Sequence, residues 1–316
     1  MGNMMENHEG EPSLRVVVHA GADKSGSTSI QGFFFDNRSD LCMKGILYPE
    51  TGLRREIFHH KDLSTCVFDE PPTPDLIEEP HIPLLPRPDF SYHEYARQLR
   101  DECRSHKVHT VLISSEALFH PIYNEIRLSR FRALLPSSEV EIVVILRNTS
   151  DWVQSRWAHQ VRHRKGFRFS PKEFTDLLRD SGQLDFDARL ALLAKVFGTE
   201  RLRVVFYDDV RTNLIQEFCS VARIQINPLL YRRAAVKNVS PSWRTISCLF
   251  RANQRALLQS RRRQLCWQMT RLYRLLPMNR RGTTPFPPCV VAMLEEHWQA
   301  CRATIIARYG VTVRQA

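Results

Sequence analysis

The chain lacks any long hydrophobic run. No stretch approaches twenty consecutive apolar residues, so we expect no membrane-spanning helix. The first residues are polar and acidic, without the apolar core of a secretory signal. The eight cysteines lie far apart, with no C-x-x-C pair and no metal-ligand spacing, which favours free thiols in a reducing compartment. These absences predict a cytoplasmic protein without a metal.

Acidic residues are also missing from one long interval. Between Glu217 and Glu295 there is no Asp or Glu, whereas arginines are frequent and the whole chain carries a net charge of +11. A surface of this kind attracts polyanions. It is interpreted either as a solvated, arginine-rich helical surface or as a peripheral contact with the inner face of an acidic membrane. No nucleic-acid partner is expected, since no helix-turn-helix, zinc or aromatic RNA-reading signature accompanies the charge.

What is present is a regular alternation of strand and helix patterns. Short, β-branched apolar runs occupy Leu14–His19, Val108–Ser114, Val140–Leu146 and Leu202–Phe206. Helical patterns cover residues 30–38, 92–106, 150–164, 171–179, 186–197, 211–222, 243–260, 264–276 and 290–309. This order predicts a doubly wound α/β fold with a mainly parallel sheet, whose ligands bind at the carboxyl ends of the strands.

The chain is expected to form one domain. Residues 1–13 are a polar tail, and residues 14–316 form a single α/β domain. A proline-rich insertion is predicted at about 69–90, since prolines in this density exclude regular structure. From about residue 229 onward the strand signals stop, and a helical, basic C-terminal portion is predicted.

The first strand leads into a loop that suits a phosphate group. Gly21 and Gly26 have the spacing of the P-loop G-x-x-x-x-G-K-[ST], but Ser27 follows the second glycine and the lysine lies inside the loop, at Lys24. Backbone N–H groups, the helix dipole and the lysine all favour an anion there. The shifted lysine indicates a phosphate ligand bound differently from ATP; the alternative is an ordinary strand-to-helix turn.

The loop resembles that of a known family. Asp23-Lys-Ser-Gly-Ser-Thr28 is similar to P-K-[ST]-G-[ST]-[ST], the 5′-phosphosulfate loop of the superfamily of sulfotransferases that use 3′-phosphoadenosine 5′-phosphosulfate (PAPS). Asp23 replaces the family's proline, and we expect its carboxylate to point outward or to pair with a base. The resemblance implies that the phosphosulfate is bound by Lys24, Ser25, Gly26, Ser27 and Thr28, with Lys24 also catalytic.

Other motifs extend this resemblance. Arg147 ends the third strand and Ser155 follows eight residues later, as in the family's 3′-phosphate site. Tyr207 lies in a segment similar to the family's F-Y-E-D, which implies a nucleotide contact. Arg281 and Gly282 match the opening of the basic loop that closes the 3′-phosphate site.

The reaction also needs a base for the acceptor. Glu116, at the end of the second strand, is the first candidate by the resemblance; its alternative role is a helix-capping carboxylate. His19, just before the loop, is the second candidate and is otherwise a structural histidine.

These motifs together predict a metal-independent enzyme that moves the sulfuryl group from PAPS to a hydroxyl or amine. His19-Ala-Gly21 and Ser114-Ser-Glu116 are most similar in style to bacterial carbohydrate sulfotransferases, which implies a carbohydrate, glycolipid or secondary metabolite as acceptor. Two alternatives are an ATP-dependent P-loop phosphotransferase and an inactive protein of this fold that binds acidic membrane or other polyanions.

Overall fold

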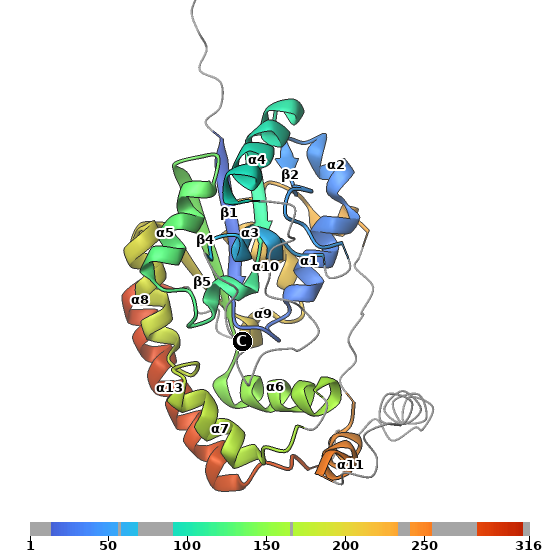
Figure 1. Ribbon diagram of the computed structural model, residues 1–316, viewed down its shortest axis with the longest axis vertical. Helices are drawn as coiled ribbons and strands as arrows, with labels where there is room; N and C mark the ends of the chain where they lie inside the picture. The colour runs from blue at the N-terminus through green and yellow to red at the C-terminus, as the bar shows by residue number, and fades with distance from the viewer. Residues whose placement is uncertain are drawn as a thin grey trace, which may run out of the picture.

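Five parallel strands form the centre of the protein (Figure 1). The computed structural model describes residues 14–55, 58–68, 91–164, 167–232, 241–254 and 283–311. The sheet has the order β2-β3-β1-β4-β5 and every strand pairing is parallel. The strands are β1 (Arg15–Gly21), β2 (Ile46–Leu47), β3 (Thr110–Ser114), β4 (Glu139–Leu146) and β5 (Leu202–Phe206). The predicted α/β class with a parallel sheet is confirmed.

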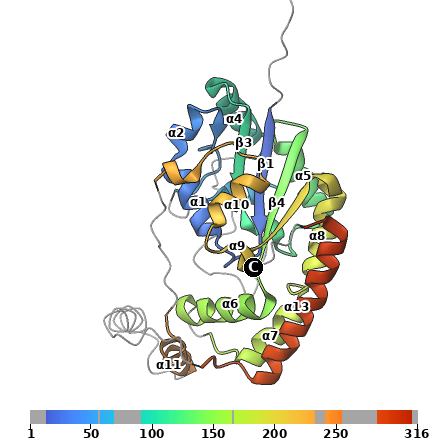
Figure 2. The ribbon, with the colours of Figure 1, turned by 180° about the vertical axis from the view of Figure 1, so that it is seen from behind.

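Helices cover both faces of this sheet (Figures 1 and 2). They are α1 (Ser27–Asp36), α2 (Arg38–Cys42), α3 (Lys61–Thr65), α4 (Tyr92–His106), α5 (Glu125–Leu134), α6 (Thr149–His163), α7 (Pro171–Asp180), α8 (Phe186–Phe197), α9 (Tyr207–Val210), α10 (Leu214–Val221), α11 (Trp243–Gln254) and α13 (Pro288–Tyr309), with a short 3₁₀ helix, η1 (Glu116–Phe119). Helices α1 and α10 pack on one face, and α5, α8 and α13 on the other.

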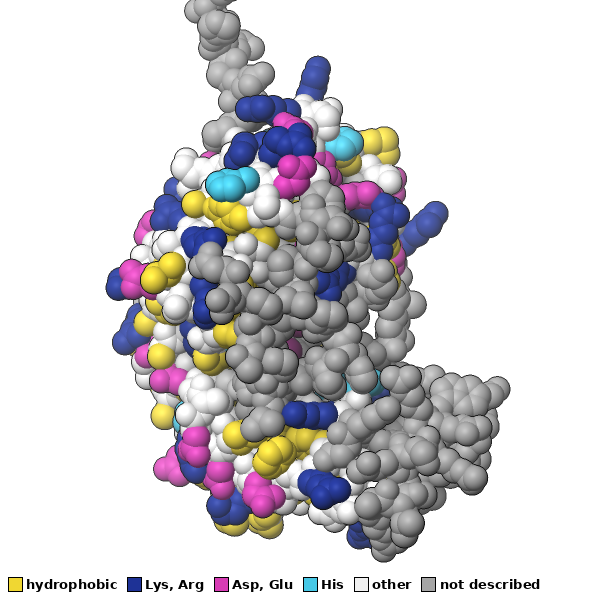
Figure 3. Space-filling model, in the orientation of Figure 1, with side chains coloured by type: hydrophobic (Ala, Val, Ile, Leu, Met, Phe, Trp, Pro, Cys, Tyr) yellow, Lys and Arg dark blue, Asp and Glu magenta, His cyan; other side chains and the backbone are white. Residues whose placement is uncertain are grey.

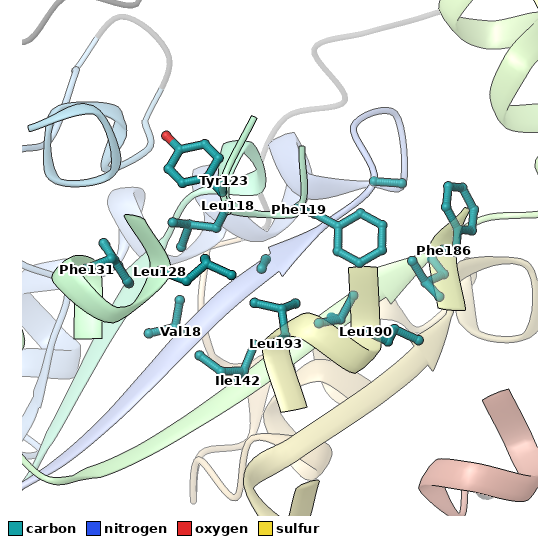
Figure 4. Close-up of a cluster of buried hydrophobic side chains, with 14 of the residues drawn as sticks. Val18, Leu118, Phe119, Tyr123, Leu128, Phe131, Ile142, Phe186, Leu190 and Leu193 are labelled. Carbon is teal, nitrogen blue, oxygen red and sulfur yellow. The ribbon is translucent and has the colours of Figure 1, made fainter. Parts of the chain in front are cut away.

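The strands separate two hydrophobic cores because successive side chains point to opposite faces. Val16 and Val18 belong to one core and Val17 to the other, and all three are fully buried. Figure 4 shows part of the first core, where Ile142 from β4 meets Leu193 from α8. Burying a side chain of this size stabilises the fold by about 1.5–3 kcal/mol, so β-branched strands account for much of the stability.

Helix α6 lies across the carboxyl end of the sheet (Figure 1). Its start is defined by Asn148, whose side-chain oxygen accepts hydrogen bonds from the backbone N–H groups of Ser150 and Asp151. The same asparagine donates from Nδ2 to Glu295 of α13 at 2.8 Å. Its backbone N–H donates to Asp208 of α9 at 2.7 Å. The cap and contacts with two other helices, α9 and α13, therefore hold the first turn of α6 in place.

Several expected elements agree closely with the structure. The helices predicted at residues 92–106 and 186–197 have those bounds. Several elements were not predicted, among them β2 and α5. Strand β2 is only two residues long, and α5 carries arginines between its buried Leu128, Phe131 and Leu134, so neither has a strong hydrophobic period.

Some predictions lie outside the described residues. These are the tail at 1–13, the proline-rich insertion at about 69–90, the helix at 264–276 and the end of the helix at 243–260. Within the described ranges, no helix is long and apolar enough to cross a membrane. On the face seen in Figure 3, Lys and Arg side chains are interspersed with Asp and Glu. Much of the predicted basic interval lies outside the described residues.

Candidate anion-binding site

Two glycines shape the loop between β1 and α1. A Cβ on Gly21 would lie 2.3 Å from the carbonyl oxygen of Ile145 in β4, so only glycine allows the two strands to approach in this way. Gly26 has a φ of +84°, and a Cβ there would lie 2.5 Å from Leu214 Cδ2 and 2.7 Å from Tyr207 Cε2. The loop is therefore packed tightly against β4, α9 and α10.

The loop presents the start of α1 to a ligand. Helix α1 begins at Ser27, directly after Gly26, and has neither an acidic residue in its first turn nor a side-chain cap within the described chain. The hydroxyls of Ser25 and Ser27 are buried, and neither has a hydrogen-bond partner among the described residues. Unsatisfied buried hydroxyls are costly. Beside an open helix N-terminus, they indicate a binding site for an anion.

Lys24 is held at both its backbone and its side chain. Its φ of +63° is unusual for a residue other than glycine. Its carbonyl accepts a hydrogen bond from Arg147 Nη1 at 3.1 Å. Its ammonium lies 2.7 Å from Nδ1 of His159 on α6. Because an ammonium only donates, Nδ1 is the acceptor and the imidazole proton is on Nε2.

Arg147 connects the loop to β5 and α9. Its guanidinium lies 5.6 Å from the centre of the Tyr207 ring, and it forms a 3.4 Å ion pair with the exposed Asp151. The Nε atom is buried and has no hydrogen-bond partner among the described residues. The structure thus brings Lys24, Gly26, Arg147 and Tyr207 together, as the sequence predicts for neighbouring strand ends.

A carboxylate lies next to this arginine. Burial raises the pKa of Asp208, while the hydrogen bond from Asn148 and the charge of Arg147 oppose the rise. Asp208 therefore anchors the start of α6 through the backbone of Asn148, close enough to Arg147 to feel its charge.

The remaining predicted donor-site residues take different positions. Ser155 is half-buried on α6, one turn before His159, and Thr28 is exposed in the first turn of α1. Arg281 and Gly282 lie outside the described residues. In the described part of the chain, no three His, Cys, Asp or Glu side chains gather as a metal site needs.

Asp23 pairs with groups on α6. Its Oδ1 accepts a hydrogen bond from Trp152 Nε1 at 2.9 Å and lies 3.6 Å from Nη1 of Arg156. The guanidinium of Arg156 also lies 5.2 Å from the Trp152 ring. The carboxylate is thus paired with a base, one of the two positions expected for it, and its charge is compensated beside the anion loop.

A cavity of about 150 Å³ opens on the other side of the loop. Its lining includes Ala22 and Asp23 from the loop, Glu116 and Phe119 from η1, and Trp152 and Arg156 from α6. Aromatic walls with a few converging polar groups are typical of small-molecule sites. Glu116 therefore lies in the same cavity as the first half of the loop.

His19 lies elsewhere. Its side chain is fully buried, its Nδ1 is 2.8 Å from the hydroxyl of Ser114, and its ring packs edge-on against Phe218 at 5.3 Å. Burial lowers the pKa of His19 to about 3. The structure places this histidine in the core behind the loop and not among the residues that line the cavity.

Sequence reasoning missed three residues of this region. His120 lines the cavity, accepts a hydrogen bond at Nδ1 from the Ile122 N–H at 3.2 Å, and has a pKa lowered to about 3, mainly by burial and then by Arg156. Arg156 and His159 lie on α6. The helical spacing of Trp152, Arg156 and Gln160, and that of Ser155 and His159, was the available signal.

Comparison with protein-family models and with curated proteins gave no match. Two solved structures are similar. The sulfotransferase from Alicyclobacillus acidocaldarius has a TM-score of 0.46 and 16% identity, over 78% of this chain and 96% of that one. The sulfotransferase domain of the Synechococcus PCC 7002 olefin synthase has a TM-score of 0.39 and 12% identity, over 87% of this chain and 100% of that one.

Proposed function

We propose that the protein is a sulfotransferase that moves the sulfuryl group from PAPS to a hydroxyl or amine of an acceptor. The observation that carries this proposal is the loop itself. It contains a helix N-terminus without a side-chain cap, the buried hydroxyls of Ser25 and Ser27 and the ammonium of Lys24. Such a site is complementary to a phosphosulfate.

The donor is proposed to lie along the carboxyl ends of the strands. The 5′-phosphosulfate occupies the segment from Lys24 to Thr28, and the 3′-phosphate is bound by Arg147 and Ser155. Tyr207 contacts the nucleoside. In support, Arg147 contacts both the loop and the Tyr207 ring. Arg281 and Gly282, outside the described residues, complete the proposed 3′-phosphate site.

Transfer then proceeds by in-line attack. The acceptor oxygen or nitrogen forms a bond to sulfur while the bond between sulfur and the bridging oxygen breaks, which releases adenosine 3′,5′-bisphosphate. Glu116 takes the acceptor's proton, and Lys24 stabilises the charge that builds on the bridging oxygen. The position of Glu116 in the cavity beside the loop favours it over His19, which is buried with a depressed pKa.

The cavity beside the loop is proposed to take the reacting end of the acceptor. Its aromatic walls and its volume of about 150 Å³ are comparable to a cavity that holds one benzene ring. One ring of a carbohydrate, glycolipid or secondary metabolite fits such a space. Glu116 and His120 also line the cavity, where they can contact the polar groups of the acceptor.

Thermal unfolding with different nucleotides tests this function. We expect adenosine 3′,5′-bisphosphate to raise the unfolding temperature more than AMP or ATP with Mg²⁺, and Lys24→Ala to reduce that rise. Lys172→Ala serves as the matched control, since Lys172 is exposed on α7 and pairs with Asp176.

Two other results would contradict the proposal and indicate a different function. Selective stabilisation by ATP with Mg²⁺ would indicate a phosphotransferase. No response to any nucleotide, with salt-sensitive binding to acidic liposomes, would indicate an inactive protein of this fold that binds membranes.

A further inference from the structure

We infer that His159 is a positioning residue for Lys24, and that it holds the lysine ammonium ready for the sulfuryl donor. This inference rests on the proposed function. It starts from the 2.7 Å contact between Lys24 Nζ and His159 Nδ1, which joins the loop to α6 across 135 residues of sequence. His159 lies outside the motifs that resemble the sulfotransferase family.

The chemistry of the contact allows it to persist when an anion binds. A lysine ammonium has three N–H donors and no acceptor. One donor serves His159, and two are left for phosphate or sulfate oxygens. The imidazole does not have to leave when the donor arrives, so it can orient Lys24 in both states.

A neutral partner also keeps the lysine charge in full. A carboxylate at this place would cancel the positive charge that the phosphosulfate needs. The nearest carboxylate in sequence, Asp23, is turned instead to Trp152 and Arg156. An imidazole that accepts through Nδ1 fixes the ammonium by a hydrogen bond and adds no negative charge of its own.

The need for such a partner follows from the lysine side chain. Lysine is long and flexible, and ordering it costs conformational entropy. The backbone of Lys24 is already fixed by the hydrogen bond from Arg147 to its carbonyl. The contact with His159 fixes the other end, so the entropy is lost before the donor binds and affinity is gained.

Helix α6 in turn supports His159. The ring of His163, one turn further along, lies 4.3 Å from the His159 ring, with 31° between their planes. Ser155 lies one turn before His159. These three residues share a face of α6, which places the proposed 3′-phosphate hydroxyl and the partner of Lys24 on one rigid element.

Calorimetric titration with adenosine 3′,5′-bisphosphate tests the inference. We expect His159→Leu to raise the dissociation constant roughly three- to tenfold, in line with the loss of one hydrogen bond. His159→Gln, which retains an acceptor, should restore binding to within about twofold. His297→Leu is the matched control, because it makes the same change at an exposed histidine of α13 and leaves the acceptor of Lys24 and its ring neighbour His163 in place.

A second measurement needs no ligand. The ¹⁵N chemical shifts of the imidazole report its tautomer, and in the ligand-free wild type at pH 8 we expect His159 to be protonated at Nε2 alone. Lys24→Met should allow the other tautomer to appear. A purely structural histidine would keep its tautomer in this variant, and that result would overturn the inference.

The outcomes separate the two proposals. If the wild type binds the bisphosphate and His159→Leu binds it equally well, the inference fails and the sulfotransferase proposal stands. If the wild type does not bind the bisphosphate, the proposed function fails, and with it the role of His159 toward this donor. Thermal unfolding of each variant verifies that it is folded.

Discussion

The carboxylate of Asp23 accepts a hydrogen bond from the indole of Trp152 at 2.9 Å, across the gap between the anion loop and α6. Arg156, one turn along the helix, lies 3.6 Å from the same oxygen. The residue that departs most clearly from the family motif thus fastens the loop to a helix. A proline at this position would have no side chain able to do so.

Asp23→Ala should therefore destabilise the protein by about 1–2 kcal/mol, since it removes a hydrogen bond and leaves Arg156 without this partner in a mostly buried place. Urea unfolding followed by tryptophan fluorescence measures the change. Asp101→Ala, which removes an exposed partner of Arg97, should leave the unfolding midpoint unchanged. Equal stability of Asp23→Ala and the wild type would show that the contact contributes nothing.

Gly26→Ala should be more harmful than Gly182→Ala. Both glycines have a positive φ, but a Cβ on Gly182 meets nothing within 4 Å, whereas one on Gly26 meets Leu214 and Tyr207. We expect a cost of about 1 kcal/mol at Gly182 from the backbone alone. At Gly26 a further ~1–3 kcal/mol is expected from overpacking. Denaturant unfolding of both variants gives the difference, and bisphosphate affinity should fall only for Gly26→Ala.

Arg189→Met should destabilise the wall of the cavity. The buried guanidinium donates to the carbonyls of Phe119, Tyr123 and Leu118 at 3.1, 3.0 and 3.3 Å. Burial lowers the pKa of Arg189 to about 10. Methionine fills similar space but leaves these carbonyls without their donor, at a cost of about 3 kcal/mol. Equilibrium unfolding checks this value. A loss below about 1 kcal/mol would mean that water replaces the guanidinium.

Acid should destabilise the protein well before its carboxylates titrate. Burial lowers the pKa of His19 to about 3 and that of His60 to about 4, from 6.5. The unfolded chain therefore binds more protons than the folded one between pH 6.5 and about 3 to 4, and stability falls as the pH falls through this window. Above pH 6.5 these histidines contribute no pH dependence.

The slope of that loss is limited to about 1.4 kcal/mol per pH unit for each histidine. Urea unfolding between pH 7.5 and 4.5 measures it. His19→Gln should reduce the slope, because it removes one of the buried imidazoles. A stability that does not change over this range would show that these histidines bind protons as readily in the folded protein as in the unfolded chain.

Much of the site was predictable because it is built on strand ends. Arg147 and Tyr207 end or follow adjacent parallel strands, and Lys24 follows a third. A parallel sheet brings residues at the carboxyl ends of its strands to one edge, whatever the length or sequence of the connecting segments. The β-branched runs that mark these strands are equally clear, since each is buried on both faces.

The contacts of α6 were not predictable in the same way. His159 and Asp23 find their partners across 135 and 129 residues of sequence. Which face of a helix meets a given loop depends on how the helix packs, and the sequence alone does not specify this. His19 illustrates the converse, since its place just before the loop suggested a base, whereas strand alternation directs its side chain into the core.

The position of helix α6 also limits which substitutions the protein can accept during evolution. One face of the helix contacts the loop between β1 and α1 through His159, and another lines the cavity through Trp152 and Arg156. A substitution that shifts α6 to admit a new acceptor also displaces the partner of Lys24. If the proposed function holds, changes of acceptor preference should therefore accumulate outside α6, for example at Ile122, which lines the same cavity.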